Sequence, residues 1–497
     1  MQSCYNTGMK RFFALFFCIA ALLSLSVVPT AADSAAAENL TDRCIFDFGT
    51  DRDAGYILLK DPKNYRVFPP QSAFSMTWED LPDGARLCLQ WQTVPDGVRV
   101  LQYDANGTML SEETLPAYYE TVTPLLPDAH TATVQAGEEH MRLLTLAVYG
   151  EGELPDPFHA WQDVPDHLDY LLIAAHPDDD VLYLGSVIPT FGEQQGYTGT
   201  VIYVTASTRE RVSEAQNGAW AMGLKIRPVF FGMPDIGRYP TKQQKQVFSE
   251  DVLLLNIVRA YRSMRPLVVF SQDLKGEYGH WQHKLVAKAA RKAFALAADP
   301  DYDPESVGTY GVWQVQKLFL HLYKENPLWI EAHEPLDAFD GKDAFEVAKA
   351  AFKKHASQQK YHFRVTRDNK KYAFNRFGMA EGIVPVGTDV FDGIDETLLS
   401  GFVPPTPEPT EAPVPEPTAV PDRTESPAAS VPHATAQGET PVQARTGDPF
   451  DPNPLYRFAA IVGISAVLAG IAGYVFSRIW IRRSQSEKKT EAKRKDD

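Results

Sequence analysis

The pattern of apolar and polar residues changes near residue 160 and divides the folded part of the chain in two. Between about Asp42 and Gly152, segments such as RLCLQWQTV, VRVLQYDA and MRLLTLAVYG alternate or run apolar, and the turn signals PDG, ANG and AGEE separate them. No long amphipathic helix is evident in this stretch. We therefore predict a small all-β sandwich domain over residues 42–152, with a jelly roll as one variant.

From Leu168 onward, short apolar runs alternate with longer stretches of helical character. The runs are DYLLIAA, TVIYVTAS, PVFFG, PLVVFS and VQKLFLHLY, and the helical stretches include RERVSEAQNGAWAMG and QKQVFSEDVLLLNIVRAYRSM. Strands that are continuous apolar runs, each followed by a helix, indicate a parallel sheet covered on both faces. We predict an α/β domain over residues 160–400, with a Rossmann-like parallel sheet in a three-layer α/β/α sandwich.

Two further apolar runs, near the two ends of the chain, predict a membrane protein. Lys10 and Arg11 precede FFALFFCIAALLSLSVV and small residues follow it, as in a secretory signal peptide, which we assign to residues 1–32. The run FAAIVGISAVLAGIAGYVF, residues 458–476, carries no charge and is long enough to cross a membrane as a helix. The basic tail, residues 477–497, would then be cytoplasmic and the folded domains extracytoplasmic, in a single-pass cell-membrane protein.

The composition adds a linker and excludes one class of partner. Residues 404–454 are rich in Pro, Thr, Glu and Ala with almost no large apolar side chain, so we expect an extended Pro-rich stalk. The net charge of −16 argues against nucleic-acid binding. Cys44 and Cys88 remain once the signal peptide is removed, and they form either a disulfide or two separate buried thiols.

Aromatic residues of the predicted β sandwich leave two interpretations open. They form either a platform on which sugar rings stack, which would make a glycan a partner of this domain, or ordinary core packing. The residues concerned are Trp78, Trp91, Tyr103, Tyr118 and Tyr119.

In the stretch LDYLLIAAHPDDDVLYLG, residues 168–185, a histidine, a proline and three consecutive aspartates follow an apolar strand. Adjacent carboxylates repel one another and are costly to desolvate, so something must compensate their charge. His176 and Asp179 lie three residues apart in the turn, where Pro177 fixes the backbone. An imidazole and a carboxylate can therefore converge on one point.

A second cluster, GEYGHWQHKL, follows the apolar strand PLVVFS and supplies His280 and His283. Carboxyl ends of parallel strands share one edge of the sheet, so both clusters are expected there. Two histidines and a carboxylate with an open fourth position are typical of catalytic zinc, or in another geometry of Fe²⁺ or another divalent ion. Asp178 is then the candidate base, and Asp180 is expected to make a helix-start contact. Taken singly, each cluster also fits a capped loop or surface histidines.

The same motifs resemble a known family. AAHPDDD is similar to the AHPDDE signature of the PIG-L/LmbE family of zinc-dependent N-acetylglucosaminyl de-N-acetylases, and YGHWQH is similar to its second motif, GHxDH. The resemblance extends over about residues 168–360 and includes RVSEAQNGAWAMG, GMPD and HASQ. The first motif is highly specific, and the others corroborate it.

The resemblance implies a role for each matching residue. It implies zinc binding by His176, Asp179 and His283, general base catalysis by Asp178, oxyanion stabilisation or help to the leaving group by His280, approach to the substrate carbonyl by Tyr278, and substrate contact by Arg211 and Asp235.

Simpler interpretations remain open for the supporting residues. Arg211 and Glu214 would also fit an exposed helical pair, Asp235 an ordinary turn residue and Tyr278 plain packing, while His355 in HASQ is expected to be structural.

Two departures from the family pattern bear on function. Asp180 replaces a glutamate, which keeps the charge, whereas Gln282 replaces the aspartate before the last histidine and is expected to weaken the orientation of His280. We expect a zinc-dependent hydrolase that removes the acetyl group from an acetylated amino sugar. A non-catalytic glycan-binding or wall-scaffold protein with a decayed metal site is the alternative, and an amidase acting on another amide is a third hypothesis.

Overall fold

The structure is a computed structural model that describes residues 35–49, 65–206, 208–367 and 371–400. Four predicted segments lie outside these residues: the signal peptide at 1–32, the stalk at 404–454, the membrane span at 458–476 and the basic tail at 477–497.

The predicted localisation requires a correction. Among the residues that the structure describes, no helix combines the length and the apolar character needed to cross a membrane. This finding contradicts the prediction of a single-pass cell-membrane protein with an extracytoplasmic catalytic domain and a cytoplasmic tail. The predicted membrane partner is corrected with it.

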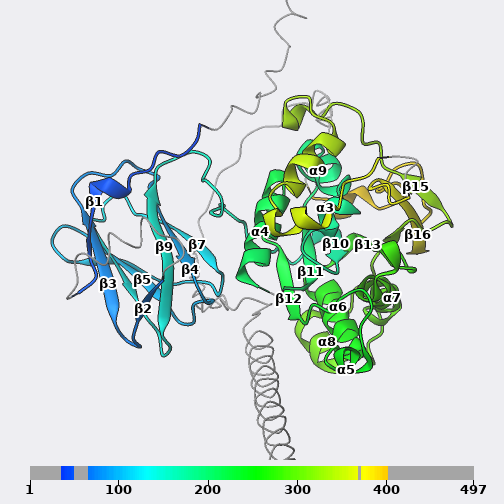
Figure 1. Cartoon of the computed structure of the whole chain (residues 1–497), viewed down its shortest axis with the longest axis horizontal. Coiled ribbons are helices and arrows are strands. Elements are labelled where there is room, and N and C mark those ends of the chain that lie inside the picture. Colours follow the sequence, from blue (N-terminus) through cyan, green and yellow to red (C-terminus); the bar gives the residue numbers. More distant parts are fainter. Residues whose placement is uncertain (1–34, 50–64, 207, 368–370, 401–497) are drawn as a thin grey trace, which may run out of the picture.

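The first part of the described chain consists of two antiparallel sheets (Figure 1). One sheet has the strand order β1-β3-β8-β5-β6 and the other has the order β2-β9-β4-β7. A short helix, η1 (Thr41–Arg43), precedes them. The strands are β1 (Cys44–Asp47), β2 (Arg66–Phe68), β3 (Ala73–Trp78), β4 (Arg86–Trp91), β5 (Arg99–Tyr103), β6 (Met109–Thr114), β7 (Glu120–Pro124), β8 (Thr131–Gln135) and β9 (Met141–Tyr149).

Alternating side chains of these strands form one apolar core between the two sheets. Trp78 and Trp91 are buried in it, and the indole of Trp91 donates a hydrogen bond to the Thr121 hydroxyl at 3.2 Å. Both tryptophans therefore pack in the core and are not available to stack on a sugar. Cys44 and Cys88 are free thiols, and burial raises the pKa of Cys44 to about 11 and of Cys88 to about 12.

The second part holds a seven-stranded sheet of order β12-β11-β10-β13-β14-β16-β15. Neighbouring strands from β12 to β14 are parallel, whereas β16 runs antiparallel to both β14 and β15. The sheet is therefore mixed, where the sequence predicted a parallel one. Its strands are β10 (Leu168–Ala174), β11 (Gly199–Thr205), β12 (Val229–Met233), β13 (Pro266–Ser271), β14 (Lys317–His321), β15 (Pro327–Trp329) and β16 (Arg376–Gly382).

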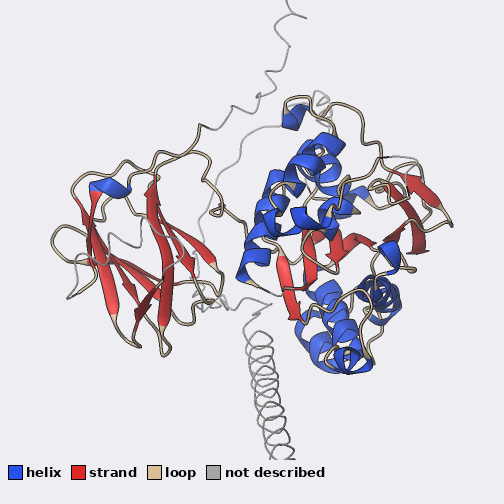
Figure 2. Ribbon diagram, viewed as in Figure 1, coloured by secondary structure: helices blue, strands red, loops and turns tan. Residues whose placement is uncertain are grey.

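The helices of this part lie on both faces of the sheet (Figure 2). The α-helices are α3 (Asp179–Leu182), α4 (Arg209–Ala221), α5 (Lys242–Gln246), α6 (Glu250–Met264), α7 (Trp281–Leu296), α8 (Pro304–Tyr310) and α9 (Ala344–Phe352). The shorter turns are the π-helical η2 (Ile188–Gln194) and the 3₁₀ helices η3 (Glu277–Gly279), η4 (Asp337–Phe339), η5 (Ala356–Tyr361) and η6 (Glu396–Leu398).

Strand β10 is buried on both faces of the sheet, which explains its uninterrupted apolar sequence. All seven of its residues are buried, and alternate side chains enter different apolar clusters. Tyr170 and Leu172 pack with α4 and α9, while Leu171 and Ile173 pack with α6 and α7 on the other face. An apolar run without polar alternation is the pattern that such two-sided burial requires.

One predicted helix is two helices. The stretch from residue 244 to 264 breaks between α5 and α6, where the Ser249 side chain accepts a hydrogen bond from the Val252 amide and starts α6 afresh. Phe248 lies between the two helices and is buried in the apolar cluster that α6 and α7 form with one face of the sheet. An N-capping serine inside an apolar helical pattern is the local signal for this interruption.

Strand order fixes where a ligand can bind. The chain passes from β10 outward through β11 to β12, then returns to β13 on the other side of β10. The loops after β10 and β13 thus leave the same edge of the sheet in adjacent positions but lead into helices on opposite faces. This is a topological switch point, where α/β sheets leave a crevice beyond the carboxyl ends of their strands.

The β-rich part contacts helix α4 directly. The Ser213 hydroxyl of α4 donates to the buried Glu120 carboxylate of β7 at 2.6 Å, and the Arg227 guanidinium lies 3.8 Å from the centre of the Tyr118 ring. Burial raises the pKa of Glu120. Helix α4 therefore packs against the sheet on one side and against β7 on another.

We predict that acid weakens the fold through His159, which stacks on Trp220 of α4 and is 3% exposed. Burial lowers the pKa of His159 from 6.5 to about 4, so below pH 6.5 the unfolded chain gains a proton that the folded chain does not take up. Stability is therefore full above pH 6.5 and falls by about 2 kcal/mol between pH 6.5 and pH 5, at about 1.4 kcal/mol per pH unit. Urea unfolding of wild type and His159→Gln at pH 7 and pH 5 should show the smaller decline in the variant. An equal decline in both proteins would contradict the prediction.

Candidate metal centre

The turn after β10 is strained and brings its carboxylates inward. Asp178 has φ 121° and ψ −19°, a conformation that costs a residue with a Cβ atom on the order of 1–3 kcal/mol. The His176 amide donates to Asp179 Oδ2 at 2.8 Å, which holds the turn closed. His176, Asp178 and Asp179 are all buried. Strain concentrated at buried acids marks this turn as a candidate functional site.

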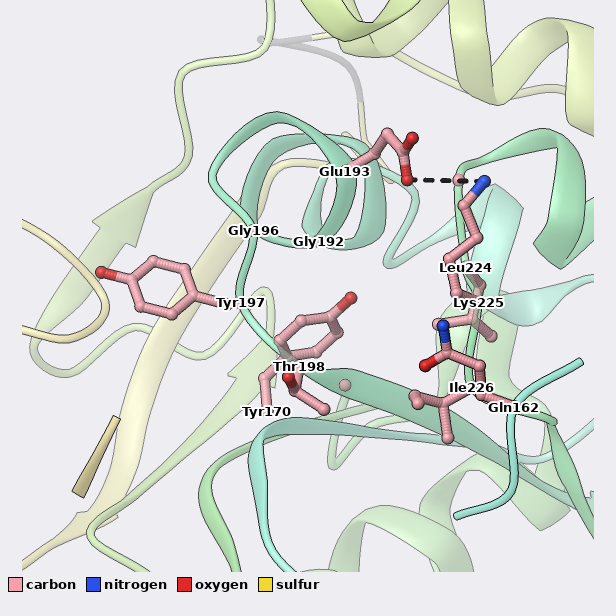
Figure 3. A pocket seen from close by; sticks show the side chains of 12 residues that line it. Gln162, Tyr170, Gly192, Glu193, Gly196, Tyr197, Thr198, Leu224, Lys225 and Ile226 are labelled. Carbon is pink, nitrogen blue, oxygen red and sulfur yellow. Dashed lines mark ion pairs between the residues drawn. The ribbon is translucent and has the colours of Figure 1, made fainter. Parts of the chain in front are cut away.

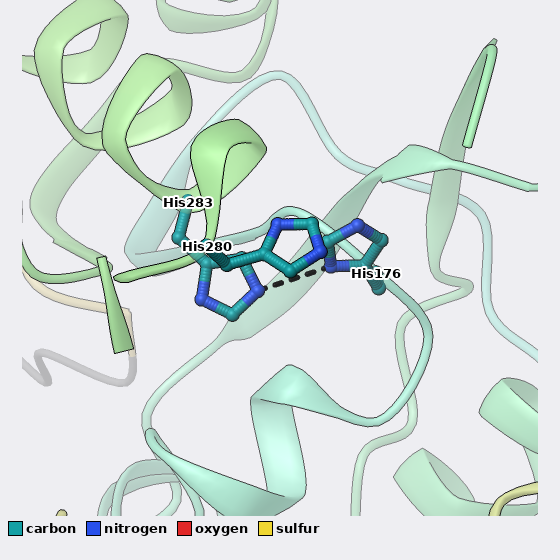
Figure 4. A group of neighbouring side chains, drawn as sticks. All are labelled: His176, His280 and His283. Carbon is teal, nitrogen blue, oxygen red and sulfur yellow. Dashed lines mark hydrogen bonds between the residues drawn. The ribbon is translucent and has the colours of Figure 1, made fainter. Parts of the chain in front are cut away.

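The loop after β13 supplies the second half of the site. It passes through η3 into α7, whose N-cap is His280, and His283 lies in the first turn of that helix. Figure 4 shows the rings of His176, His280 and His283 gathered between the two segments. The two loops therefore meet, as the sequence predicted from the shared edge of the sheet.

Three ligand atoms lie close enough to share one ion. His176 Nδ1 is 3.1 Å from Asp179 Oδ2 and 3.1 Å from His283 Nε2, and His283 Nε2 is 3.4 Å from Asp179 Oδ2. Ligands about 2.0–2.1 Å from a tetrahedral Zn²⁺ are separated by roughly 3.3 Å. Two imidazole nitrogens and a carboxylate oxygen at these separations fit a zinc ion with an open fourth position.

The charges of these groups also favour a cation. Burial lowers the pKa of His176, but the hydrogen bond and charge of Asp179 outweigh burial and raise the pKa to about 9. Burial favours a higher pKa for Asp179, yet His283 and His176 hold it well below the usual range. The site thus stabilises positive charge beside an ionised carboxylate, and a divalent ion is suited to supply that charge.

Gln282 orients one of the metal-ligand candidates. Its side-chain NH₂ donates to the Pro234 carbonyl at 2.8 Å, and its side-chain oxygen accepts from the Ile236 amide at 2.8 Å. His176 Nε2 lies 3.1 Å from the same oxygen and must carry the hydrogen. In the neutral ring this tautomer leaves the Nδ1 lone pair free to bind the proposed ion.

The expectation for Gln282 therefore needs correction. Its side chain contacts His176 and not His280, and only its backbone amide reaches His280, donating to Nδ1 at 3.3 Å. The replacement of aspartate by Gln282 does not remove a side-chain partner of His280 in this structure.

His280 is distinguished from the other two histidines by its protonation. Burial and then the charges of His176 and His283 lower the pKa of His280 to about 3, so its ring is neutral at pH 7. Because Nδ1 accepts from a backbone amide, Nε2 of the neutral ring carries the hydrogen and is a donor. Three histidine nitrogens within 4.8 Å of one another also form a potential ligand set, but this tautomer favours Asp179 over His280 as third ligand.

Arg211 holds Asp178 in place. Its Nη2 atom donates to Asp178 Oδ1 at 3.3 Å and to the Pro177 carbonyl. Burial raises the pKa of Asp178, which the charge of Arg211 opposes and the charge of Asp179 reinforces. A carboxylate with a raised pKa is suited to accept and return a proton near neutral pH.

The exposed helical pair considered for Arg211 and Glu214 is not what the structure shows. Both residues are buried, and Glu214 accepts hydrogen bonds from the amide and hydroxyl of Ser357, each at 2.6 Å. His355 is fully buried beside Phe352, and burial lowers its pKa to about 3. The HASQ segment therefore packs against α4, the helix that carries Arg211.

Tyr278 and Asp235 lie at the border of the centre. The half-buried Tyr278 ring lies 5.6 Å from the His280 ring and 5.2 Å from the Arg238 guanidinium, and Tyr278 has a positive φ of 43°. The exposed Asp235 has Oδ1 at 3.7 Å from His176 Nε2. Asp180 is buried in the first turn of α3, where burial raises its pKa to about 7.

Sequence reasoning missed three residues close to the candidate ligand His283: Glu277, His321 and Tyr183. Glu277 bonds to His283 and to His321, and the Tyr183 ring lies 5.9 Å from the His283 ring. His321 ends β14, the strand next to β13, so its position at the carboxyl edge was a signal available from the sheet pattern. Glu277 and Tyr183 carry no comparable signal, because each lies among ordinary loop or helix residues.

A separate cavity of about 270 Å³ lies at the opposite end of the strands, near the start of β10 and β11 (Figure 3). Tyr170, Glu193, Thr198 and Lys225 line it, and Glu193 pairs with Lys225 at 3.6 Å. It includes none of the residues of the metal centre.

Comparison with known proteins supports the motif analysis. Residues 171–294 match the model of the GlcNAc-PI de-N-acetylase family, PIG-L, and the chain therefore contains a PIG-L family domain. A 1D-myo-inositol 2-acetamido-2-deoxy-alpha-D-glucopyranoside deacetylase of Catenulispora acidiphila is 27% identical over 186 residues, which is 32% of this chain and 57% of that protein. A deacetylase of the same name from Frankia casuarinae is 43% identical over 179 residues, 30% of this chain and 57% of that protein. The chain thus spans little more than half the length of either relative.

Two solved structures are matched by this chain at TM-scores below 0.5. N,N'-diacetylchitobiose deacetylase from Pyrococcus horikoshii has 18% identity and a TM-score of 0.30, and the match covers 39% of this chain and 70% of that one. A conserved protein from Thermus thermophilus has 20% identity and a TM-score of 0.29, covering 44% of this chain and 97% of that one.

We predict that Asp179, and not His280, completes the metal ligand set. Asp179→Asn should weaken zinc binding more than about 100-fold. Loss of a residue that only hydrogen-bonds to a ligand costs about 10–100-fold, so a larger loss indicates a ligand. His280→Gln should bind zinc within about ten-fold of wild type. Competition with a chromophoric chelator measures both affinities, with Asp235→Asn as the exposed-carboxylate control. The reverse ranking of Asp179→Asn and His280→Gln would contradict this assignment.

Proposed function

We propose that this protein is a zinc-dependent N-deacetylase that hydrolyses the acetamide of an N-acetylglucosamine-type amino sugar, releasing acetate and a free amine. The observation that carries the proposal is the convergence of His176 Nδ1, Asp179 Oδ2 and His283 Nε2 within 3.1–3.4 Å, directly beside the strained carboxylate of Asp178. The names of the related deacetylases support this choice of substrate class.

The first role belongs to Asp178. When bound, zinc supplies a water of lowered pKa and polarises an acyl oxygen. Asp178 then accepts the proton of the attacking water, for which the raised pKa of its buried carboxyl is suited. Arg211 keeps Asp178 Oδ1 oriented through the 3.3 Å contact.

The donors around the acyl group have a complementary role. The Nε2–H of neutral His280 can donate to the oxyanion that develops on the carbonyl oxygen, and the Tyr278 hydroxyl is a second candidate donor. As the carbon–nitrogen bond breaks, the protonated Asp178 returns its proton to the departing amine. The proton taken from water thus ends on the product amine, and the hydroxyl ends on acetate.

Arg211 and Asp235 are the proposed contacts to the sugar. Arg211 Nη1 is buried without a hydrogen-bond partner among the described residues, and Asp235 is exposed at the border of the centre. A hydroxyl-bearing ring beside the acetamide could be hydrogen-bonded by both. The non-catalytic alternative rested on Gln282, and the hydrogen bond between Gln282 and His176 supports the catalytic proposal instead.

We also propose how the chain is divided. The activity is assigned to residues 160–400, as a three-layer α/β/α unit with helices over both faces of the sheet, and residues 42–152 form a separate all-β unit. Each unit having its own apolar core supports this division.

The direct test is deacetylation by the full chain loaded with zinc. On a panel of N-acetylglucosamine, its oligosaccharides and N-acetylglucosaminyl-inositol, wild type should release acetate and an equal amount of amine. Asp178→Asn should lower kcat by about 10²–10⁴-fold while zinc content stays unchanged, because only the proton acceptor is lost. Zinc binding without turnover on the panel, by either acetate or amine detection, would contradict the proposed function.

His280→Gln tests the oxyanion donor separately. The substitution should lower kcat by about 10²–10³-fold with little change in KM, because the donor acts on charge that develops in the transition state. Steady-state kinetics on the best substrate of the panel measure the two constants. A rise in KM at unchanged kcat would instead assign His280 to ground-state binding.

A further inference from the structure

We propose that Glu277 and His321 form a buried carboxylate–imidazolium pair that holds His283 in its metal-binding tautomer. Neither residue reaches the proposed substrate, so both are positioning residues. The inference rests on the proposed zinc site and concerns how the protein prepares one of its ligands.

Glu277 is shared between two histidines. Its Oε2 atom lies 2.7 Å from His283 Nδ1, and its Oε1 atom lies 2.6 Å from His321 Nδ1 and accepts from the Asp273 amide at 3.0 Å. The side chains of Glu277, His283 and His321 are all 0% exposed. The carboxylate is therefore completely desolvated and bonded on both oxygens.

The contact with Glu277 determines the tautomer of His283. A carboxylate accepts hydrogen bonds, so His283 Nδ1 must carry the hydrogen, which leaves the Nε2 lone pair free. Nε2 is the atom that faces His176 Nδ1 at 3.1 Å and Asp179 Oδ2 at 3.4 Å. Without the Glu277 acceptor, the hydrogen could occupy either nitrogen, and part of the protein would present N–H to the metal.

The surroundings of His321 determine its charge. Its Nε2 atom lies 2.9 Å from the Ala373 carbonyl oxygen, which can only accept, and its Nδ1 atom faces the Glu277 carboxylate. Both ring nitrogens therefore donate, and a ring with two N–H groups is an imidazolium. Glu277 Oε2 faces His283 Nδ1, and Oε1 faces His321 Nδ1 and the Asp273 amide, so hydrogen-bond donors surround both oxygens and favour the ionised carboxylate.

Charge balance explains why the pair is needed. An isolated buried carboxylate is strongly unfavourable, and an adjacent imidazolium offsets that cost while leaving the other oxygen for His283. The carboxylate in turn makes His283 a more basic ligand. The two ligand histidines thus differ: the neutral amide of Gln282 orients His176, and an anion orients His283.

The backbone around Glu277 is built to point its side chain inward. Gly276, Tyr278 and Gly279 all have positive φ, at 68°, 43° and 79°. A Cβ atom at Gly276 would lie 2.4 Å from the His280 carbonyl oxygen, so this loop accepts only glycine there. This loop conformation buries the Glu277 side chain between His283 and His321.

The charge of His321 provides the first test. Nitrogen-15 NMR of the full chain with labelled histidine, at pH 7, should show both His321 nitrogens protonated in wild type, with assignment by loss of the signals in His321→Gln. In Glu277→Gln the ring should become neutral, because the side-chain amide can donate to Nδ1. A neutral His321 in wild type would overturn the inference, whether or not the protein binds zinc or deacetylates any sugar.

Zinc affinity provides the second test. Glu277→Gln and His321→Gln should each weaken zinc binding about 10–100-fold, the usual cost of losing an outer partner of a ligand histidine. Glu214→Gln is the matched control, since its buried carboxylate bonds to Ser357 and should leave the affinity unchanged. Unchanged affinity in folded Glu277→Gln, as judged by its melting temperature, would overturn the inference. If that variant does not fold, His321→Gln and the wild-type spectrum still decide it.

Discussion

The site depends on the contact between the loops after β10 and β13, where positive charge must compensate three buried aspartates. Asp178, Asp179 and Asp180 enter the interior consecutively, and such a run of carboxylates is unfavourable unless positive charge accompanies it. The structure places Arg211 against Asp178 and two histidine nitrogens within 3.4 Å of Asp179. Asp179 raises the pKa of His176 despite its burial, whereas burial and then the charges of His176 and His283 lower the pKa of His280.

The sheet topology makes this meeting possible. The chain leaves β10 in one direction and returns to β13 in the other, so segments about a hundred residues apart in sequence emerge side by side. Gln282 and Glu277 lie outside the proposed ligands, and their hydrogen bonds favour one tautomer each for His176 and His283. His176 follows a strand and His283 lies in the first turn of a helix, and hydrogen bonds hold both rings. A preorganised catalytic site requires side chains held in this way.

Much of this arrangement could be predicted from the sequence because it follows from local pattern. Apolar runs located the interior strands, and histidines in the loops that follow two of them located the edge where these loops meet. The antiparallel β16 and the roles of Gln282 and Glu277 could not be predicted. Each depends on contacts between distant segments, such as Gln282 with Pro234, or Glu277 with His321. The prediction of localisation was wrong for a different reason, because it was inferred from segments near the chain ends and not from the described residues.

X-ray absorption at the zinc edge of the loaded full chain tests the central claim most directly. The account predicts two imidazole nitrogens and one carboxylate oxygen at about 2.0–2.1 Å, with one further light-atom ligand from solvent. The imidazole contribution should fall by one in His176→Gln and again in the double variant with His283→Gln. Three imidazoles around zinc in wild type, or an imidazole contribution unaltered by these substitutions, would contradict the account.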